Sequence, residues 1–222
     1  MEFLQYIPVV MIHREKDKER EFFMETFEKK LGIDIQRVEA QDGEELLKTQ
    51  EIPRKHPRDR EETSVGNIGC TFSHVSICET FLETEHDHIC IFEDDVELVS
   101  DSEDLFDYIE YSNELAEWDI LFLGTNEIVE GTPLKEQPLI SDVKRFWGTH
   151  AVILTRKAAQ AIVHEFQSSV VEGYALPADW LYSFAIQHQK LIAYCPTESR
   201  SYVQQKENLV STCTGKLRVY SK

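Results

Sequence analysis

The sequence DHICIFEDDVE, residues 87–97, places three acidic residues directly after four apolar ones. A short, uninterrupted apolar run, here residues 89–92, is typical of a strand buried on both faces, as in a parallel sheet. Ligands of open α/β sheets bind beyond the carboxyl ends of such strands. Glu93, Asp94 and Asp95 therefore follow this strand at the place where a ligand is expected.

The spacing of the three acids suggests a cation site. In an extended chain, residues two apart point to the same side, which would place Glu93 and Asp95 together and Asp94 opposite. Two carboxylates on one side suit a hard divalent cation that takes its other oxygens from waters and a diphosphate. The alternative is a solvated turn, since acidic residues are abundant in this chain. From these three residues alone, the two interpretations stand level.

Composition narrows the class of protein. With 222 residues, of which 41% are hydrophobic, the chain can form one α/β core or two small domains, and its length favours one. A formal net charge of -18 argues against nucleic acid or an anionic membrane surface as a partner. A phosphorylated ligand would then need a metal or a few well-placed cations. No apolar stretch approaches the length of a membrane span.

The cysteines and the ends of the chain indicate a reducing compartment. The five cysteines have no compact spacing and no CxxC pair, so neither a zinc site nor a disulfide framework is expected; they are Cys70, Cys78, Cys90, Cys195 and Cys213. The first ten residues lack the basic start of a signal peptide, and the last residues are not an endoplasmic-reticulum retention signal. We expect a cytoplasmic protein, in a bacterium or in a virus-infected host.

Alternating strand and helix patterns predict an α/β fold with βαβ units and no linker or repeat, hence one domain over residues 1–222. Strands are expected at residues 7–12, 35–38, 89–92, 120–123, 151–154 and 191–194, and helices at residues 16–30, 66–83, 101–115, 156–166 and 179–187. Residues 44–65 and about 126–144 are expected to be loops. The polar tail from residue 204 is expected to be mobile or to fold over the site.

Several residues near the expected strand ends are candidate ligands of a phosphate group. Arg14 closes the first strand, where a basic residue could meet a phosphate. Gly66 and Gly69 open a helix and would let a ligand approach its free N–H groups, although glycines before helices are common. His74 lies in the first turns of that helix, where a structural hydrogen-bonding role is the more frequent one. Asp42 lies in the turn after the second strand.

Taken in order, these motifs resemble glycosyltransferase family 25, which includes bacterial lipooligosaccharide galactosyltransferases and the procollagen galactosyltransferases. The resemblance covers roughly residues 7–210. It is carried by Ala40-Gln41-Asp42-Gly43, the glycine–Cys–Ser-His motif from Gly66 to His74, Glu93-Asp94-Asp95, Trp118-Asp119 to Gly124, Gly148-Thr149-His150-Ala151, Pro177-Ala178-Asp179, Pro196 and Gln204. One departure is Met11-Ile12-His13, where many members have Asn-Leu-Asp before the arginine.

The resemblance implies a GT-A type fold, in which a Rossmann-like mixed sheet is flanked by helices within a single domain. The donor-binding part would be about 1–125 and the acceptor part about 126–222. It also implies a UDP-sugar donor, usually UDP-galactose, with Mn²⁺ (or Mg²⁺) held by a DxD-like motif. The implied reaction is inverting transfer to a hydroxyl of a glycan or of a hydroxylysine-containing protein.

The resemblance assigns roles to individual residues. Asp95 is the best candidate metal ligand, Asp94 its partner or a ribose contact, and Glu93 the next ligand. The residues expected beside the donor are Arg14, Asp42, Gly66, Gly69, His74, Glu93 and Asp94. His150 and Asp179 fall on the acceptor side. His150 could serve in catalysis, bind the metal or orient another ligand.

An inverting transfer needs a base for the acceptor hydroxyl and positive charge for the leaving diphosphate. Asp179 is our candidate base, because it follows a proline at the start of an expected helix. Its alternative role is an N-cap, worth about 1 kcal/mol to the helix. Two other functions stay open: a retaining transferase or nucleotidyltransferase, and a catalytically inactive sugar-nucleotide-binding or scaffold protein.

Overall fold

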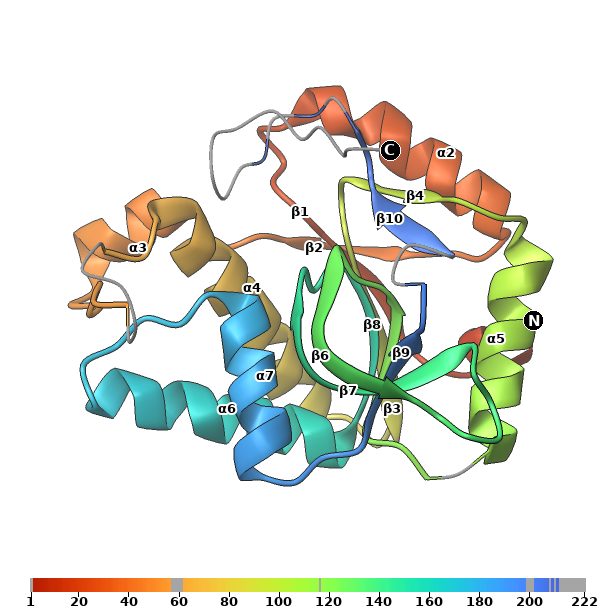
Figure 1. Ribbon diagram of the computed structural model, residues 1–222. Helices are drawn as coiled ribbons and strands as arrows, with labels where there is room; N and C mark the ends of the chain where they lie inside the picture. The colour runs from red at the N-terminus through yellow and green to blue at the C-terminus, as the bar shows by residue number, and fades with distance from the viewer. Residues whose placement is uncertain are drawn as a thin grey trace.

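The computed structural model describes residues 2–56, 62–115, 117–198, 202–207, 209 and 211 (Figure 1). Its centre is an eight-stranded mixed sheet with the strand order β2-β1-β3-β8-β5-β9-β7-β6. The strands are β1 Val9–His13, β2 Gln36–Glu39, β3 His88–Glu93, β5 Ile120–Gly124, β6 Glu127–Pro133, β7 Ile140–Trp147, β8 Ala151–Thr155 and β9 Ala193–Pro196. The predicted mixed sheet flanked by helices is confirmed.

Helices cover both faces of the sheet (Figure 1). One face packs against α4, α6 and α7, and the other against α2 and α5. The helices are α1 Glu2–Gln5, α2 Glu21–Leu31, α3 Gly43–Thr49, α4 Val65–Leu82, α5 Ser102–Leu115, α6 Arg156–Val171 and α7 Ala178–His188, with a 3₁₀ turn η1 at Lys18–Arg20. No helix of the described residues is long and apolar enough to cross a membrane.

Strand β3 carries the apolar run and lies inside the sheet. The four residues 89–92 are all buried, which confirms the predicted buried strand. β3 runs parallel to β1 and antiparallel to β8, so the parallel arrangement holds on one side only. Its carboxyl end coincides with that of β1, because Ile12 pairs with Glu93. The acids and the residues that follow β1 are therefore neighbours.

A second, two-stranded sheet covers this edge. After β3 the chain turns at Asp94 and Asp95 into β4, Val96–Leu98, which pairs antiparallel with β10, Val203–Gln205. The backbone N–H of Lys206 also donates to the carbonyl of Asp95, at 2.6 Å. The start of the tail thus folds over the acids, as one of the two expectations had it. Residues 212–222 lie outside the described residues.

Both expected loops contain regular structure. Residues 43–49 form α3, because Asp42 caps its first turn by accepting from the N–H groups of Glu44 and Glu45. Residues 127–147 form the β6–β7 hairpin at the edge of the sheet. The side chains of β6 are mostly exposed, so the strand lacks the apolar alternation that predicts a strand from sequence. The loop prediction was therefore wrong for residues 127–144 and for residues 44–49, whereas residues 50–56 and 62–64 form no helix or strand, as predicted.

The first predicted helix is shorter than expected. Residues 18–20 form the 3₁₀ turn, and α2 runs from Glu21 to Leu31 and ends at Gly32, as predicted. Its core face is made by Met24, Phe27 and Leu31, whereas Phe23 is only half-buried. Because α2 begins only at Glu21, Arg20 lies in the preceding 3₁₀ turn, and its side chain is buried there.

Candidate active site

A small cavity of about 70 Å³ lies at the carboxyl ends of β1 and β3 and beside the first turns of α4. The candidate residues that line it are Arg14, Gly66, Gly69, Glu93, Asp94 and Asp95. Asp42, His74, His150 and Asp179 are not on its wall. The structure thus brings six of the ten candidate residues to one cavity. Its position beyond the carboxyl ends of two parallel strands is the one expected for a ligand site.

Asp94 and Asp95 share a buried cation that the sequence did not reveal. Arg20 is 4% exposed, and its guanidinium bonds Asp94 and lies 3.4 Å from Oδ2 of Asp95. Burial disfavours the charged guanidinium, but the charges of Asp95 and Asp94 outweigh it and raise the pKa of Arg20. Burial also disfavours the charged form of Asp94 and so raises the pKa of this carboxyl, and the charge of Arg20 partly offsets the rise. His13 holds the other oxygen of Asp94, at 2.8 Å from Nδ1.

Glu93 and Asp95 contact a common partner, but the expected placement of Asp94 on the opposite side was wrong. Asp94 and Asp95 form a turn, Arg20 contacts both, and all three acids line the cavity. Nε2 of Gln205 lies 3.2 Å from Oε2 of Glu93 and 3.5 Å from Oδ1 of Asp95. The amide oxygen of Gln205 accepts from Asn126 at 2.9 Å, which fixes its orientation. One amide nitrogen therefore contacts both carboxylates.

The second oxygen of Glu93 faces the helix α4. Oε1 lies 3.5 Å from Nε2 of His74 and accepts from the hydroxyl of Thr149 at 3.2 Å. His74 is completely buried, and its Nδ1 lies 3.0 Å from the hydroxyl of Tyr182 on α7. His74 does not line the cavity itself, yet its imidazole contacts Glu93 of the cavity wall. It acts on the site through Glu93.

Asp179 lies in the first turn of α7, behind Glu93. The N-cap of α7 is Pro177, and Asp179 instead accepts from Gly148 N–H at 3.5 Å and from the N–H of Trp180 at 2.9 Å. Burial raises the pKa of Asp179 to about 6; the backbone N–H groups oppose this rise and the charge of Glu93 adds to it. The structure therefore does not support the alternative that Asp179 is the N-cap.

The two-residue segment Gly148-Thr149 connects both carboxyl groups. Gly148 donates to Asp179, and the next residue, Thr149, donates to Glu93. Gly148 has φ +90°, and a Cβ atom there would lie 2.7 Å from Nδ2 of Asn126. Only glycine fits this turn without strain. The segment thus links Asp179 and Glu93 through the backbone of one residue and the side chain of the next.

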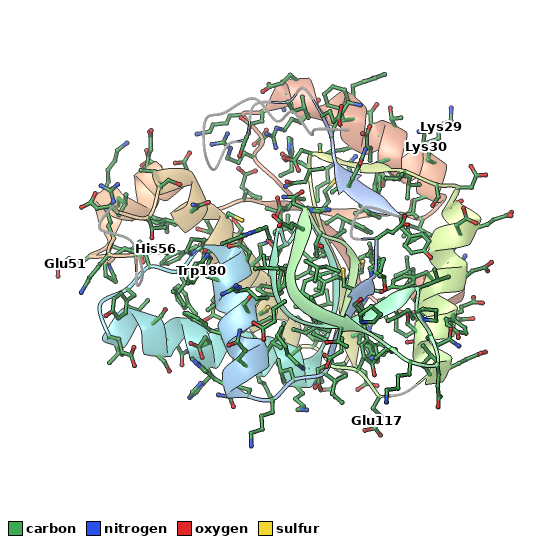
Figure 2. All side chains as sticks on the ribbon, in the orientation of Figure 1. Lys29, Lys30, Glu51, His56, Glu117 and Trp180 are labelled. Atoms are coloured by element: carbon green, nitrogen blue, oxygen red, sulfur yellow. The ribbon has the colours of Figure 1, made fainter. Side chains whose placement is uncertain are left out.

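An aromatic group lies next to Asp179. The ring of Trp180 contacts His56, Trp147 and Phe184, with centroid distances of 4.9, 6.0 and 5.7 Å. Figure 2 shows His56 and Trp180 side by side. Trp147 is 36% exposed, so part of this group faces solvent. Half-exposed aromatic rings are frequent in the walls of ligand sites.

Three other candidate residues have structural partners. Asp42 caps α3 and pairs with Lys16, whose hydrogen bond lowers the pKa of that carboxyl. Gly69 packs on the turn before α3, since a Cβ atom there would lie 2.6 Å from the carbonyl oxygen of Gln41. His150 is completely buried, with Nε2 3.4 Å from the carbonyl oxygen of Val203 in β10. It supports the strand that carries Gln205.

Arg14 and Gly66 remain positioned for a ligand. Arg14 lies directly after β1 on the cavity wall, where Asp17 accepts from its Nε at 2.7 Å. Helix α4 begins at Val65, one residue before Gly66, and Ser64 caps it by accepting from the N–H of Asn67. Together with Arg20, Arg14 gives this acidic protein a local pair of cations at the cavity.

The sequence analysis missed residues whose partners are far away in the chain. Arg20 and His13 are separated from Asp94 by 74 and 81 positions, and Gln205 from Glu93 by 112 positions. Arg20 lies within the helix expected over residues 16–30, whose many charges gave no sign that this side chain is buried. A basic residue within an exposed, charged stretch of sequence gives no local sign that its side chain is buried. Tyr182 was missed because its partner, His74, lies 108 positions away in the chain.

Comparison with known proteins gives the family. The sequence profile of glycosyltransferase family 25, described as an LPS biosynthesis protein, matches residues 7–181. The chain belongs to glycosyltransferase family 25. A comparison of this family 25 chain with curated proteins found no match.

Solved structures similar to this family 25 protein are distant. The crystal structure of A197 from STIV has 13% identity and a TM-score of 0.42, and covers 86% of this chain and 82% of that one. Mouse xyloside xylosyltransferase 1 (apo form) has 10% identity and a TM-score of 0.42, with 83% and 69% covered. A glycosyltransferase involved in the glycosylation of the major capsid of PBCV-1 has 10% identity and a TM-score of 0.40, with 83% and 75% covered.

The donor set at the cavity suits the hard divalent cation that the family resemblance implies. Glu93 and Asp95 offer oxygens on one side, and Mn²⁺ or Mg²⁺ in such enzymes needs only one or two carboxylates besides phosphates and waters. The amide N–H of Gln205 stands between the two carboxylates as a partial positive charge. Asp94 fits less well, because His13 and Arg20 hold its two oxygens.

Proposed function

We propose that this family 25 chain is a metal-dependent inverting glycosyltransferase that moves a sugar, with galactose as the first candidate, from a UDP-sugar to a hydroxyl. The observation that carries the proposal is that the consecutive residues Gly148 and Thr149 donate to Asp179 and to Glu93, respectively. One carboxyl has a pKa near neutrality, and the other borders a cavity with two arginines. A base and a site for an anionic leaving group thus lie next to each other.

On the donor side, the diphosphate would lie in the cavity at the ends of β1 and β3. Arg14 would bind a phosphate oxygen, and Asp95 and Glu93 would hold Mn²⁺ or Mg²⁺. When bound, the cation supplies positive charge for the leaving diphosphate. Asp94 would keep Arg20 in place, and His74 would orient Glu93. Gly66 would allow close approach of the donor at the start of α4.

On the acceptor side, Asp179 would take the proton of the attacking hydroxyl. A base works best when its pKa is near the working pH, and burial brings the pKa of Asp179 to about 6. The N–H groups of Gly148 and Trp180 each donate to one oxygen of Asp179, and a remaining lone pair of the carboxylate would receive the acceptor proton. His150 would act from a distance, by supporting β10 and so Gln205.

The donor and acceptor parts would be formed by the first and second halves of the chain. Every residue that lines the cavity precedes position 96, which supports a donor part of about 1–125. Asp179, Trp147 and Trp180 belong to the acceptor part, about 126–222, where the aromatic group offers a surface for a sugar ring. We propose a glycan as acceptor, with a hydroxylysine-containing protein as the alternative. Free Cys70, Cys78, Cys90 and Cys195 support a reducing, cytoplasmic setting.

Thermal unfolding with a panel of nucleotide sugars, with and without Mn²⁺, tests the proposal. A ligand at 100 times its Kd stabilises the folded state by about 2.7 kcal/mol, which gives a clear shift in Tm. We expect a UDP-sugar to stabilise the protein in a metal-dependent way and to be cleaved to UDP in the presence of acceptor glycans. Product with retained anomeric configuration would indicate a retaining enzyme. Binding without turnover would indicate a sugar-nucleotide-binding scaffold, and no shift with any nucleotide would overturn the donor site.

A further inference from the structure

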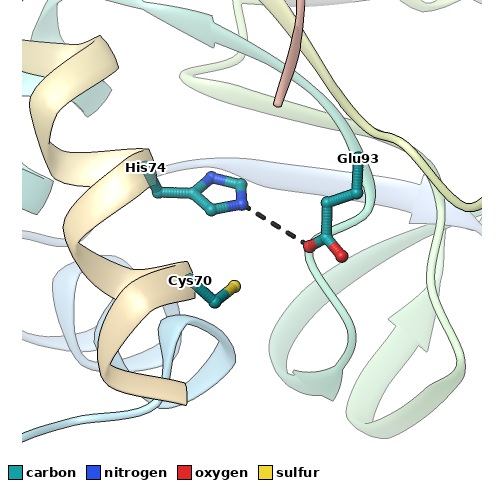
Figure 3. A group of neighbouring side chains, drawn as sticks. All are labelled: Cys70, His74 and Glu93. Atoms are coloured by element: carbon teal, nitrogen blue, oxygen red, sulfur yellow. Dashed lines mark ion pairs between the residues drawn. The ribbon is translucent and has the colours of Figure 1, made fainter. Parts of the chain in front are cut away.

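We propose that Cys70, His74 and Glu93 form a binding site for a zinc-type divalent cation, next to the oxygen site at Glu93 and Asp95 and sharing Glu93 with it. Their ligand atoms, one thiol sulfur, one imidazole nitrogen and one carboxylate oxygen, all lie within 4.8 Å of one another. Figure 3 shows the side chains of Cys70 and His74 extending from α4 toward Glu93. The proposal does not depend on a transferase activity.

The orientation of the His74 imidazole leaves Nε2 as the nitrogen that could bind a metal ion. The side chain is fully buried, Nδ1 is held by the Tyr182 hydroxyl, and Nε2 has no hydrogen-bond partner within the described part of the chain. Nε2 faces Oε1 of Glu93 at 3.5 Å, which is beyond the usual hydrogen-bond length of about 3.2 Å. If Nδ1 donates to Tyr182, a nitrogen lone pair faces a carboxylate oxygen. A cation between these two atoms would give Nε2 a partner.

The spacing fits tetrahedral coordination. Two ligands at the normal zinc–nitrogen and zinc–oxygen bond lengths are separated by about 3.3 Å when they occupy corners of a tetrahedron. The observed separation between His74 Nε2 and Glu93 Oε1 is 3.5 Å. Cys70 and His74 are four positions apart on α4, and residues so spaced share one face of a helix. Only small side-chain rotations would therefore bring the three ligand atoms to one centre.

The types of ligand atom at each site determine which metal ion is preferred there. A thiolate and an imidazole favour zinc over the hard cations Mn²⁺ and Mg²⁺, whereas the oxygens of Glu93 and Asp95 favour the latter. Cys70 and Glu93 both line the cavity, so the fourth position would face it and take a water or a phosphate oxygen. The arrangement differs from a Cys–His–acid nucleophile, because Nε2 faces the acid and Nδ1 is already held by a tyrosine.

Glu93 would connect the two cation sites through its two oxygens. Oε1 faces His74, and Oε2 faces the Gln205 amide that also contacts Asp95. Binding of zinc requires the thiol of Cys70 to lose its proton, so one proton is released to solvent for each ion bound as thiolate. Affinity should therefore rise with pH until the thiol is ionised without the metal.

Titration of the purified full-length protein with Co²⁺ tests the site, because a cobalt–thiolate bond gives a near-ultraviolet charge-transfer band that oxygen ligands do not. We expect this band in the wild type, its loss on addition of Zn²⁺, and its absence in Cys70→Ala. Cys78→Ala is the matched control on the same helix and should retain the band, since Cys78 is fully buried away from the cluster. Tyr182→Phe should weaken binding about tenfold through loss of the His74 orientation.

A second measurement needs no variant. Zn²⁺ should slow alkylation of Cys70 in the wild type, followed by peptide mass spectrometry, and leave the rates of the other cysteines unchanged. Asp95→Asn should still show the cobalt–thiolate band, which separates this site from the oxygen site. The proposal is overturned if the wild type gives no thiolate band, if the band survives in Cys70→Ala, or if zinc fails to protect Cys70.

Discussion

Oε1 of Glu93 lies 3.5 Å from Nε2 of His74, so a residue of the cavity wall is in contact with the buried side of α4. The other oxygen of Glu93 meets Gln205 from the tail strand β10. One side chain thus joins three segments that are distant in the sequence. Glu93 is therefore a direct link between the cavity and the buried His74.

Replacing Glu93 by Gln should abolish metal-dependent stabilisation by the UDP-sugar. The amide removes the negative charge that a cation needs, while the side chain keeps its size. We expect at least a tenfold loss of metal affinity, about 1.4 kcal/mol, measured from the Tm shift over a Mn²⁺ series. Glu97→Gln is the control, because Glu97 bonds Gln204 and Lys206 on the outer strand. An unchanged Mn²⁺ response in Glu93→Gln would exclude Glu93 as a ligand.

Replacing Arg20 by Met should destabilise the fold strongly. The change leaves Asp94 and Asp95 buried without their shared cation, and breaking a buried ion pair in this way costs about 3–5 kcal/mol. Urea unfolding measures the loss. Arg37→Met is the control, since its partner Glu28 and the guanidinium are both partly exposed, and such pairs contribute about 0–1 kcal/mol.

The double variant Arg20→Met with Asp94→Asn should recover part of that loss, because it removes one of the two unpaired carboxylates. Contacting residues are expected to show such non-additive effects. If both single losses simply add, Arg20 does not act as the counter-cation of Asp94.

Asp179 should make activity depend on pH. The base works only when it is ionised, so kcat/KM of the wild type should rise with pH and level off above about pH 6, the pKa of Asp179. Asp179→Asn should lose at least 100-fold in rate, of the order that a general base contributes. Asp107→Asn, an exposed position on α5, should keep the wild-type profile. An active Asp179→Asn enzyme would assign the base to another group.

The same carboxyl should lower stability at neutral pH. Its folded-state pKa of about 6 lies above its ordinary value of 3.8, so the folded protein binds the proton more tightly than the unfolded chain. The stability from this group is therefore full at pH below about 4 and is lost as pH rises through about 6. Relative to the wild type, Asp179→Asn should gain stability between pH 4 and pH 8 in urea unfolding. A constant difference across this range would contradict the assigned pKa.

Replacing Gly148 by Ala should impair the site beyond its effect on stability. The backbone at φ +90° costs about 1–2 kcal/mol for a residue with a Cβ atom, and that atom would displace Asn126, which orients Gln205. Gly173→Ala is a matched control, since Gly173 has φ +85° and nothing within 4 Å. Gly173→Ala should lose only the stability that its backbone conformation costs, and Gly148→Ala at least as much because of Asn126. Only Gly148→Ala should lose turnover at a temperature well below its Tm. Equal turnover would separate Gly148 from the site.

The local pattern of the chain was sufficient for the elements that lie inside the sheet. The apolar runs at β3, β5 and β8 predicted buried strands, because an internal strand is apolar on both faces. The pattern failed at the sheet edge, where the exposed strand β6 has no apolar alternation and depends on pairing with β7. It also failed at α3, whose start depends on the Asp42 cap.

By itself, the sequence determined an acid-tipped buried strand in a mixed α/β fold, together with an ordered set of motifs that placed the chain in its family. Only the tertiary structure decided which groups surround the acids: Arg20 and His13 on one side, Gln205 on another and His74 behind them. The physical reason is that hydrophobic periodicity reports burial of neighbours in sequence. A charged side chain whose partners lie 74 to 112 positions away carries no such local signal.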